Sequence, residues 1–137
     1  MPANGLVTVR SPYSPEETMN RLEAEVACRG MKVFARIDHA ASAEAAGLGL
    51  QPTELLVFGD ARGSTPLMQA ARPVGVDLPL RVLVWQDEAR ATWLTYNDPC
   101  WVAQRHGVSG SAPAAVTIAA TLGDLVAATA HPGAYPG

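Results

Sequence analysis

The stretch that decides the fold is residues 54 to 85, ELLVFGDARGSTPLMQAARPVGVDLPLRVLVW, where two apolar runs flank a glycine-rich turn and a short helical segment. Leu55 to Phe58 is a continuous apolar run, which is typical of a strand buried on both faces. Thr65-Pro66 predicts a helix start, because threonine is a good cap and proline needs no hydrogen-bond partner at the first helical position. Pro73 closes that helix, and Leu80 to Trp85 predicts the second strand.

Upstream, the pattern predicts a strand, a helix and another strand. Gly5 to Ser11 alternates apolar and polar residues, as a half-buried strand does. Ser14-Pro15-Glu16-Glu17 combines a capping serine, a first-position proline and a glutamate that can close a capping box, and Gly30 ends the helix. Met31 to His39 alternates again, so we expect a strand in which His39 shares the inward-facing phase. Ser42 to Ala46 predicts one further helical turn.

Downstream, Thr92 to Asn97 predicts a strand that forms an antiparallel hairpin with the strand ending at Trp85. Asp98-Pro99 predicts a short helix that ends at Gly107. Residues 109 to 113 form a linker, after which five apolar residues share one helical face, namely Ala115, Ile118, Leu122, Leu125 and Val126.

The domain already looks complete near Val108, so we expect residues 1–108 to form the domain and residues 109–137 to add a linker, a helix and a tail. An apolar helical face must be covered, and we expect this one to pack on a partner subunit or at a dimer edge. The prolines and glycines from His131 to Gly137 predict a frayed tail.

Composition excludes several classes of protein. With 137 residues, 48% hydrophobic and 17% charged, the chain is long and apolar enough for one globular domain. A net charge of -3 gives no basic footprint for nucleic acid. The apolar stretches look shorter than the roughly 20 residues of a membrane span, and no signal peptide is evident, so we expect a cytoplasmic protein without membrane contact. Cys28 and Cys100 lack metal-ligand spacing, so we expect separate reduced thiols, no metal and no cofactor.

Taken in order, a series of short motifs resembles one known family. The series comprises Gly5-Leu6, Ile37-Asp38-His39, Phe58-Gly59, Thr65-Pro66-Leu67-Met68, Asp77-Leu78-Pro79 and Tyr96-Asn97-Asp98-Pro99. It resembles the bacterial and archaeal domain-of-unknown-function family 302 (DUF302) over residues 5–108. The resemblance implies an α+β fold like that of the TATA-box-binding protein, with helices mainly on one face of an antiparallel sheet, and it suggests a homodimer. It implies no reaction, and a shared fold carries no DNA-binding function with it.

Three features are candidates for chemistry. His39 is the first, because an inward-facing imidazole at a strand end can act as acid or base or bind a ligand, and the alternative is a hydrogen-bonded core histidine. Cys100 is a weaker catalytic candidate at a helix start, where Asp98 opposes thiolate formation. Residues 59 to 65 follow a strand and open a helix, so Arg62 could help to hold an anion there, although the spacing is not that of a phosphate loop.

Phe58, Met68 and Tyr96 could line a cavity near His39, and methionine adapts well to irregular ligands, but core packing explains the same residues. We therefore expect a homodimeric binding module for a small apolar or weakly anionic ligand, with His39, Phe58, Met68 and Tyr96 at its site. The alternatives are an enzyme that uses His39 as acid or base, and a structural or regulatory interaction domain.

Overall fold

The structure, a computed structural model, describes residues 4–133 and has the expected α+β architecture. Five antiparallel strands form one sheet in the order β1-β5-β4-β3-β2. They are β1 (Leu6–Ser11), β2 (Lys32–Asp38), β3 (Thr53–Gly59), β4 (Leu80–Gln86) and β5 (Thr92–Asn97). The hairpin predicted for the last two strands is confirmed, with Val84 opposite Leu94.

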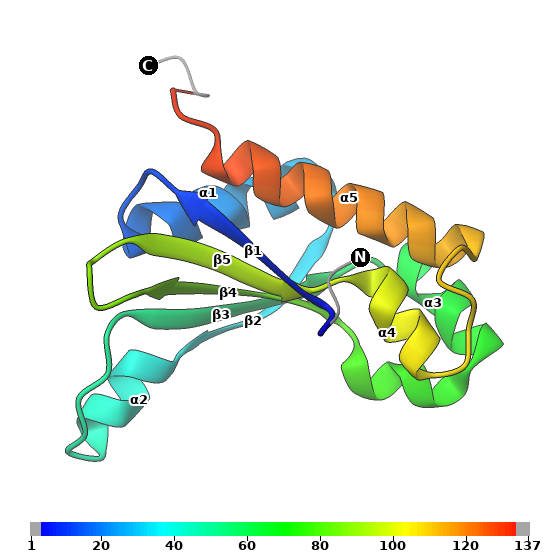
Figure 1. The fold of residues 1–137 in the computed structure, drawn as a ribbon, viewed down its shortest axis with the longest axis horizontal. Coiled ribbons are helices and arrows are strands. Elements are labelled where there is room, and N and C mark those ends of the chain that lie inside the picture. Colours follow the sequence, from blue (N-terminus) through cyan, green and yellow to red (C-terminus); the bar gives the residue numbers. More distant parts are fainter. Residues whose placement is uncertain (1–3, 134–137) are drawn as a thin grey trace.

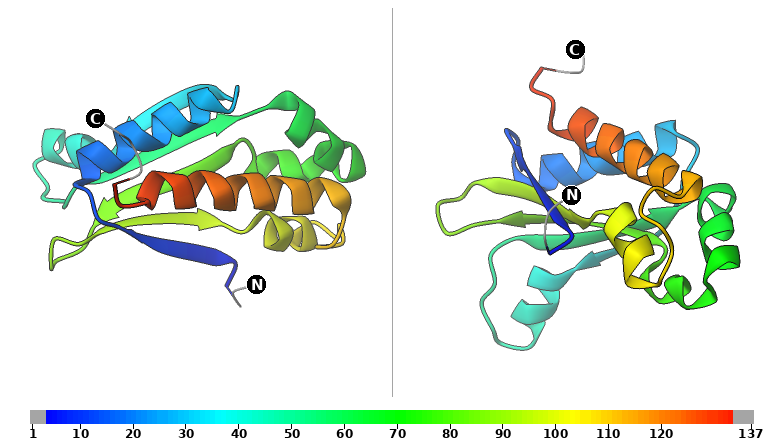
Figure 2. Two further views of the ribbon diagram at one scale, coloured as in Figure 1. Left: turned by 90° about the horizontal axis from the view of Figure 1, so that it is seen from above. Right: turned by 45° about the vertical axis from the view of Figure 1, so that its right-hand side comes forward.

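The helices cover one face and both ends of the sheet. α1 (Pro15–Cys28) and α5 (Pro113–Ala130) lie side by side across one face (Figures 1 and 2). α3 (Ala61–Ala70), the 3-10 helix η1 (Arg72–Asp77) and α4 (Pro99–Arg105) gather at one end, and α2 (His39–Ala45) projects from the other end toward the uncovered side (Figure 1).

Local capping signals explain where most helices begin. The Ser14 hydroxyl accepts a hydrogen bond from the Glu17 amide, and Asp98 caps α4 through the Cys100 amide, so both predicted starts are confirmed. The predicted start of α3 at Thr65 is wrong. Asp60 caps this helix five residues earlier, through the Arg62 amide, and Pro66 lies inside the helix. α3 ends at Ala70, and Pro73 falls within η1.

α5 belongs to the core of its own subunit. Leu122, Leu125 and Val126 are buried with α1 and the sheet, while Ala115 and Ile118 are buried with α3 and α4. The expectation that this helix packs on a partner is therefore wrong, because α5 packs against elements of residues 4–108 in its own subunit. By length and composition α5 is also able to cross a membrane, although we expected no apolar stretch of that length. Its apolar stripe is already packed against other elements of the subunit.

The end of α5 is held by a small polar cluster. The Tyr13 hydroxyl donates to the His131 carbonyl at 2.7 Å, and Arg21 donates to the Thr129 and His131 carbonyls at 3.0 and 3.2 Å. The frayed tail was expected to begin at His131, but the carbonyl of that residue is held by the Tyr13 hydroxyl. Residues 134–137 lie outside the described part of the chain.

His39 does not face inward, which corrects the expectation from strand alternation. The pairing of β2 with β3 shifts register between Val33 and Ala35, so Phe34 bulges out and is 54% exposed. β2 then ends at Asp38, whose carboxylate caps α2 through the Ala41 amide at 2.8 Å. His39 is thus the first residue of α2, and its side chain is exposed.

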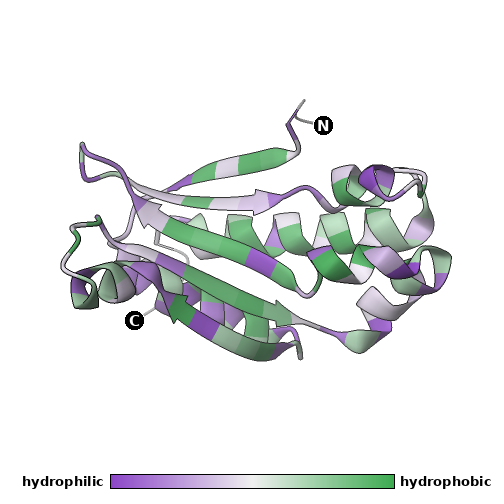
Figure 3. Ribbon diagram, turned by 90° about the horizontal axis from the view of Figure 1, so that it is seen from below, coloured by the Kyte–Doolittle hydropathy of each residue, from purple (hydrophilic) through white to green (hydrophobic). Residues whose placement is uncertain are grey.

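The face of the sheet opposite α1 and α5 is uncovered among residues 4–133 and is largely apolar (Figure 3). Leu56, Val82 and Leu94 are fully buried beneath the helices, so the residues that alternate with them point to the other side. This open face is formed by Leu55, Val57, Leu83, Trp85, Trp93 and Thr95, together with Arg81 opposite Val57 and with Thr8 and Arg10 on β1. Leu55 to Phe58 is therefore covered on one face only, although its composition predicted burial on both.

Candidate ligand-binding cavity between α1, α2 and the sheet

A cavity of about 520 Å³ lies where the start of α1, one side of α2 and the adjoining ends of β2 and β3 meet. We call it the α2 cavity. Its charged lining consists of Glu16, Arg36, Asp38, Glu44 and Glu54, and its apolar lining includes Leu48, Leu50 and Val84. Its volume is within the range of small-molecule sites, about 300 to 1,000 Å³.

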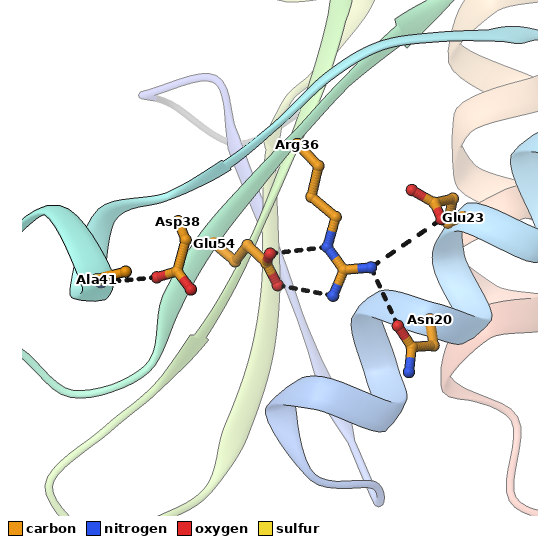
Figure 4. A network of polar contacts seen from close by, with 6 residues as sticks. All are labelled: Asn20, Glu23, Arg36, Asp38, Ala41 and Glu54. Atoms are coloured by element: carbon orange, nitrogen blue, oxygen red, sulfur yellow. Dashed lines mark hydrogen bonds and ion pairs between the residues drawn. The ribbon is translucent and has the colours of Figure 1, made fainter.

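Arg36 is the centre of the polar network in this cavity (Figure 4). Its Nε and Nη2 donate to the two carboxylate oxygens of Glu54 at 2.7 and 3.0 Å, which is a bidentate ion pair. Its Nη1 donates to Asn20 Oδ1 on α1 at 3.0 Å and lies 4.0 Å from Glu23. The hydrogen bond to Glu54 raises the pKa of Arg36, so the guanidinium keeps its charge and ties β2, β3 and α1 together.

The lining as a whole is acidic. Glu54 neutralises Arg36, whereas Glu16, Asp38 and Glu44 form no ion pair within residues 4–133. Asp38 uses one oxygen to cap α2, which leaves its second oxygen available. Four carboxylates around one guanidinium therefore leave the cavity with an excess of three negative charges.

The apolar part of the cavity comes from the segment after α2. Leu48 is 68% exposed and Leu50 is 51% exposed, both unusually high values for leucine. Each lines the α2 cavity. A ligand with a cationic group and an apolar portion would meet the carboxylates with one part and cover these leucines with the other.

The structure separates the four residues expected to share a ligand site. Phe58 and Tyr96 belong to the core beneath α1 and α5, and burial together with the Asp98 charge raises the pKa of Tyr96. Met68 lines a different pocket, beside α3. His39 is exposed on α2, between two residues that line the α2 cavity, but is not itself part of the lining.

Cys100 is a poor nucleophile in this environment. Burial and the adjacent Asp98 carboxylate raise the pKa of its thiol, which opposes the effect of the helix start. Both cysteines are free thiols, with Cys28 exposed and Cys100 half-buried. At the start of α3, the expected anion site is already occupied by the Asp60 carboxylate. This carboxylate accepts a hydrogen bond from the Arg62 amide at 3.1 Å. Within residues 4–133, no three His, Cys, Asp or Glu side chains lie close enough to hold a metal ion.

Sequence reasoning missed Arg36 and Glu54. Arg36 was assigned to the face away from the apolar phase of its strand, and the bulge beside Phe34 reverses that assignment. The only available signal was charge complementarity between two strands predicted to be near neighbours, and it was too general to select this pair.

A family model described as "Domain of unknown function DUF302" matches residues 7–129, which includes most of α5. A crystal structure of an uncharacterized conserved protein DUF302 from Bacillus stearothermophilus has a TM-score of 0.76 and 22% sequence identity, and covers 93% of this chain and 97% of that chain. At that identity the likeness concerns the fold alone.

Two curated relatives are named as ion channels. The "Fluoride-specific ion channel FluC 1" of Brucella suis biovar 1 is 50% identical over 113 residues, which is 82% of this chain and 44% of the relative. The "Fluoride-specific ion channel FluC 2" of Brucella melitensis biotype 1 is also 50% identical over 113 residues, which is 82% of this chain and 42% of the relative. The chain thus spans less than half the length of these relatives.

Proposed function

The chain belongs to the DUF302 family, a family defined without an activity, and we propose that it is a binding module whose ligand occupies the α2 cavity. The observation that carries this proposal is a cavity of about 520 Å³ that combines three carboxylates without an ion pair with an exposed apolar segment. A module that binds without reacting needs charge and shape only, and both are present there.

The ligand we propose is a small organic cation with an apolar portion. The negative lining favours a positive head group and disfavours the weakly anionic ligand expected from the sequence. Leu48 and Leu50 favour an apolar chain on the same molecule, which agrees with the apolar half of that expectation.

Three probes of equal chain length separate these contributions. Hexylamine, hexanol and hexanoate share one apolar chain and differ in charge, so isothermal titration calorimetry with each compares the head groups directly. We expect hexylamine to bind best and hexanoate worst, with a hexylamine affinity that falls as salt is added.

Glu44→Gln should weaken hexylamine binding by about two- to fivefold, the value of one exposed charge interaction. Glu88→Gln removes an equal charge outside the lining and is the matched control. Equal binding of the three probes, or equal losses in the two variants, would contradict the proposal.

The enzyme alternative has little support in the geometry. Its intended acid or base, His39, is exposed and forms no side-chain hydrogen bond within residues 4–133. Catalytic histidines usually lie in a cleft with an orienting partner. We therefore keep binding as the proposal, with a cytoplasmic location.

The homodimer expected from the resemblance is also part of the proposal, and the open face is the surface we assign to it. β3 and β4 carry mostly apolar residues on both faces, with Arg81 as the charged residue on the open side, and such a composition is typical of a sheet covered on both sides. Two polar contacts on the open face are internal: Trp85 Nε1 donates to Thr95 Oγ1 at 2.8 Å, and Thr8 Oγ1 lies 3.0 Å from Thr95 Oγ1. A second copy that covers these residues displaces few of their hydrogen bonds to water, whereas the exposed Arg81 must stay at the rim of the contact or meet an acceptor there.

The two Brucella relatives favour a role beside a fluoride channel. They share 50% identity with this chain and are more than twice as long as the matched region. Since the only membrane-capable helix among residues 4–133 is α5, which is a core helix, we propose an accessory domain that does not conduct fluoride itself. The acidic α2 cavity would repel fluoride as well.

Fluoride efflux from vesicles tests the channel association. The Brucella suis relative would be reconstituted in two forms, one intact and one lacking the region that matches this chain. Vesicles that contain either form should release fluoride, whereas vesicles that contain this chain alone should release none. Fluoride efflux through this chain alone would overturn the accessory role.

A further inference from the structure

A second pocket, of about 290 Å³, lies on the far side of the molecule from α2, where the β2 bulge and the end of β3 meet α3 and η1. We call it the Met68 pocket. We infer that it binds a small aromatic molecule that carries a hydrogen-bond donor. This inference is independent of the α2 cavity.

Two glycines keep this pocket open. A Cβ atom on Gly59 would stand 3.5 Å from Pro79 Cβ and 3.9 Å from Phe34 Cε2, so it would project among the lining side chains. A Cβ atom on Gly75 would lie only 3.3 Å from Met68 Sδ. Neither glycine has a positive φ angle, so the backbone does not require glycine at either place. What the two glycines provide is space.

The apolar lining suits an aromatic ring. The bulge in β2 turns the Phe34 ring outward to the mouth of the pocket, and Met68, Leu78 and Pro79 form its walls. Aromatic rings pack well against phenylalanine in offset or edge-to-face geometry, and against the methionine thioether. The Phe34 side chain is 54% exposed even though the Lys32 ammonium lies 5.2 Å from its ring centroid, so a ligand ring could cover apolar surface that Lys32 leaves open to water.

The rim of the pocket offers hydrogen-bond acceptors. Asp60 uses Oδ1 to cap α3, and its Oδ2 has no partner within residues 4–133. The Thr65 hydroxyl also lines the pocket without a partner in that range. The Ser64 hydroxyl already donates to the Asp60 carbonyl at 3.1 Å. A phenol O–H or an indole N–H would therefore find an acceptor, while a carboxylate on the ring would be repelled by Asp60.

NMR titration of the full chain with indole, toluene and benzoate tests this inference. Indole should give saturable shifts of the Gly59 and Gly75 amides and of the Met68 methyl group. Toluene lacks the donor and should bind several-fold more weakly, and benzoate should bind least. Shifts that spread over the surface without saturation would overturn the inference.

Two variants fix the site. Phe34→Ala removes an exposed ring, so it should leave folding intact while it weakens indole binding by about tenfold, a free-energy difference of about 1.4 kcal/mol. Gly75→Ala should weaken it similarly by filling the pocket. Gly123→Ala on α5, whose added Cβ would have no neighbour within 4 Å outside its own helix among residues 4–133, is the matched control. Indole affinity that is unchanged in Phe34→Ala would also overturn the inference.

Discussion

At the scale of single residues, Asp77 joins two segments that are far apart in the chain. Its carboxylate lies 2.6 Å from His106 Nε2 and accepts from Arg105 Nη1 at 3.2 Å. Both partners come from the end of α4, although Asp77 itself ends η1. His106 is paired with Asp77 and is only 12% exposed at its side chain.

Asp77→Ala should therefore reduce the free energy of unfolding by about 1 to 3 kcal/mol, because it removes a hydrogen-bond acceptor from two groups on α4. Urea denaturation measures the change. Asp124→Ala, on the exposed side of α5, is the control and should be nearly neutral. In a double-mutant cycle, His106→Ala should add less to Asp77→Ala than it costs alone. Fully additive effects would contradict the pairing.

Cys100 has a testable pH dependence. Its pKa is raised by burial first and by the Asp98 carboxylate second, so its thiolate forms only at a higher pH than that of an ordinary thiol. The alkylation rate with iodoacetamide should keep rising above the pH at which a free thiol has reached its maximum. Asp98→Asn removes the charge and should move the profile to lower pH. A profile that levels off with that of a small free thiol would contradict this assignment.

At the scale of secondary structure, the sequence predicted the elements whose signals are local. The starts of α1 and α4 follow from a capping side chain and a proline, and both are observed. The start of α3 was missed because Asp60 and Thr65 are both good caps, and the choice depends on where β3 ends. The β2 bulge was not predicted because it arises from the pairing of β2 with β3, and no residue type within β2 indicates it.

α5 shows the same division between local and tertiary information. Its apolar stripe was predicted residue by residue and is buried as predicted. Its covering surface was not predicted, because the stripe is equally suited to its own sheet or to a partner. The candidate site was harder still to predict from the sequence, because Arg36, Glu44 and Glu16 come from three elements that only the fold brings together.

Leu125→Ala should destabilise the chain by about 2 to 5 kcal/mol, because Leu125 is fully buried between α5, α1 and the sheet. Val116→Ala on the exposed side of the same helix is the matched control and should cost less than about 1 kcal/mol. Thermal and urea unfolding compare the two.

A chain truncated after Ser109 should fail to fold at any concentration, and a folded truncated chain would restore the boundary at residue 108.

At the scale of the whole molecule, the open face is the feature that a single subunit leaves unexplained. The strands were interpreted as buried on both faces, and one of those faces has no cover within residues 4–133. The composition of β3 and β4 is therefore the observation behind our proposal that a second copy covers this face. α2 projects on this same side of the sheet, so it stands at the edge of the surface that a second copy would meet (Figure 1).

Leu83→Arg should convert a dimer into a monomer, because it adds a second guanidinium beside Arg81 and places it among the apolar residues at the middle of the open face. In the monomer the long arginine side chain can reach water, so the fold should survive. Sedimentation velocity measures the association state, and circular dichroism confirms folding. Val116→Arg, which adds the same charge on exposed α5, is the control and should remain dimeric.

Trp85 and Trp93 give an independent readout, since both lie on the open face and their rings stack with centroids 6.3 Å apart. Their fluorescence should shift to longer wavelength when the parent chain is diluted below its dissociation constant, and should already be shifted in Leu83→Arg. A parent chain that sediments as a monomer at every concentration, with emission that does not respond to dilution, would remove the second copy from the open face.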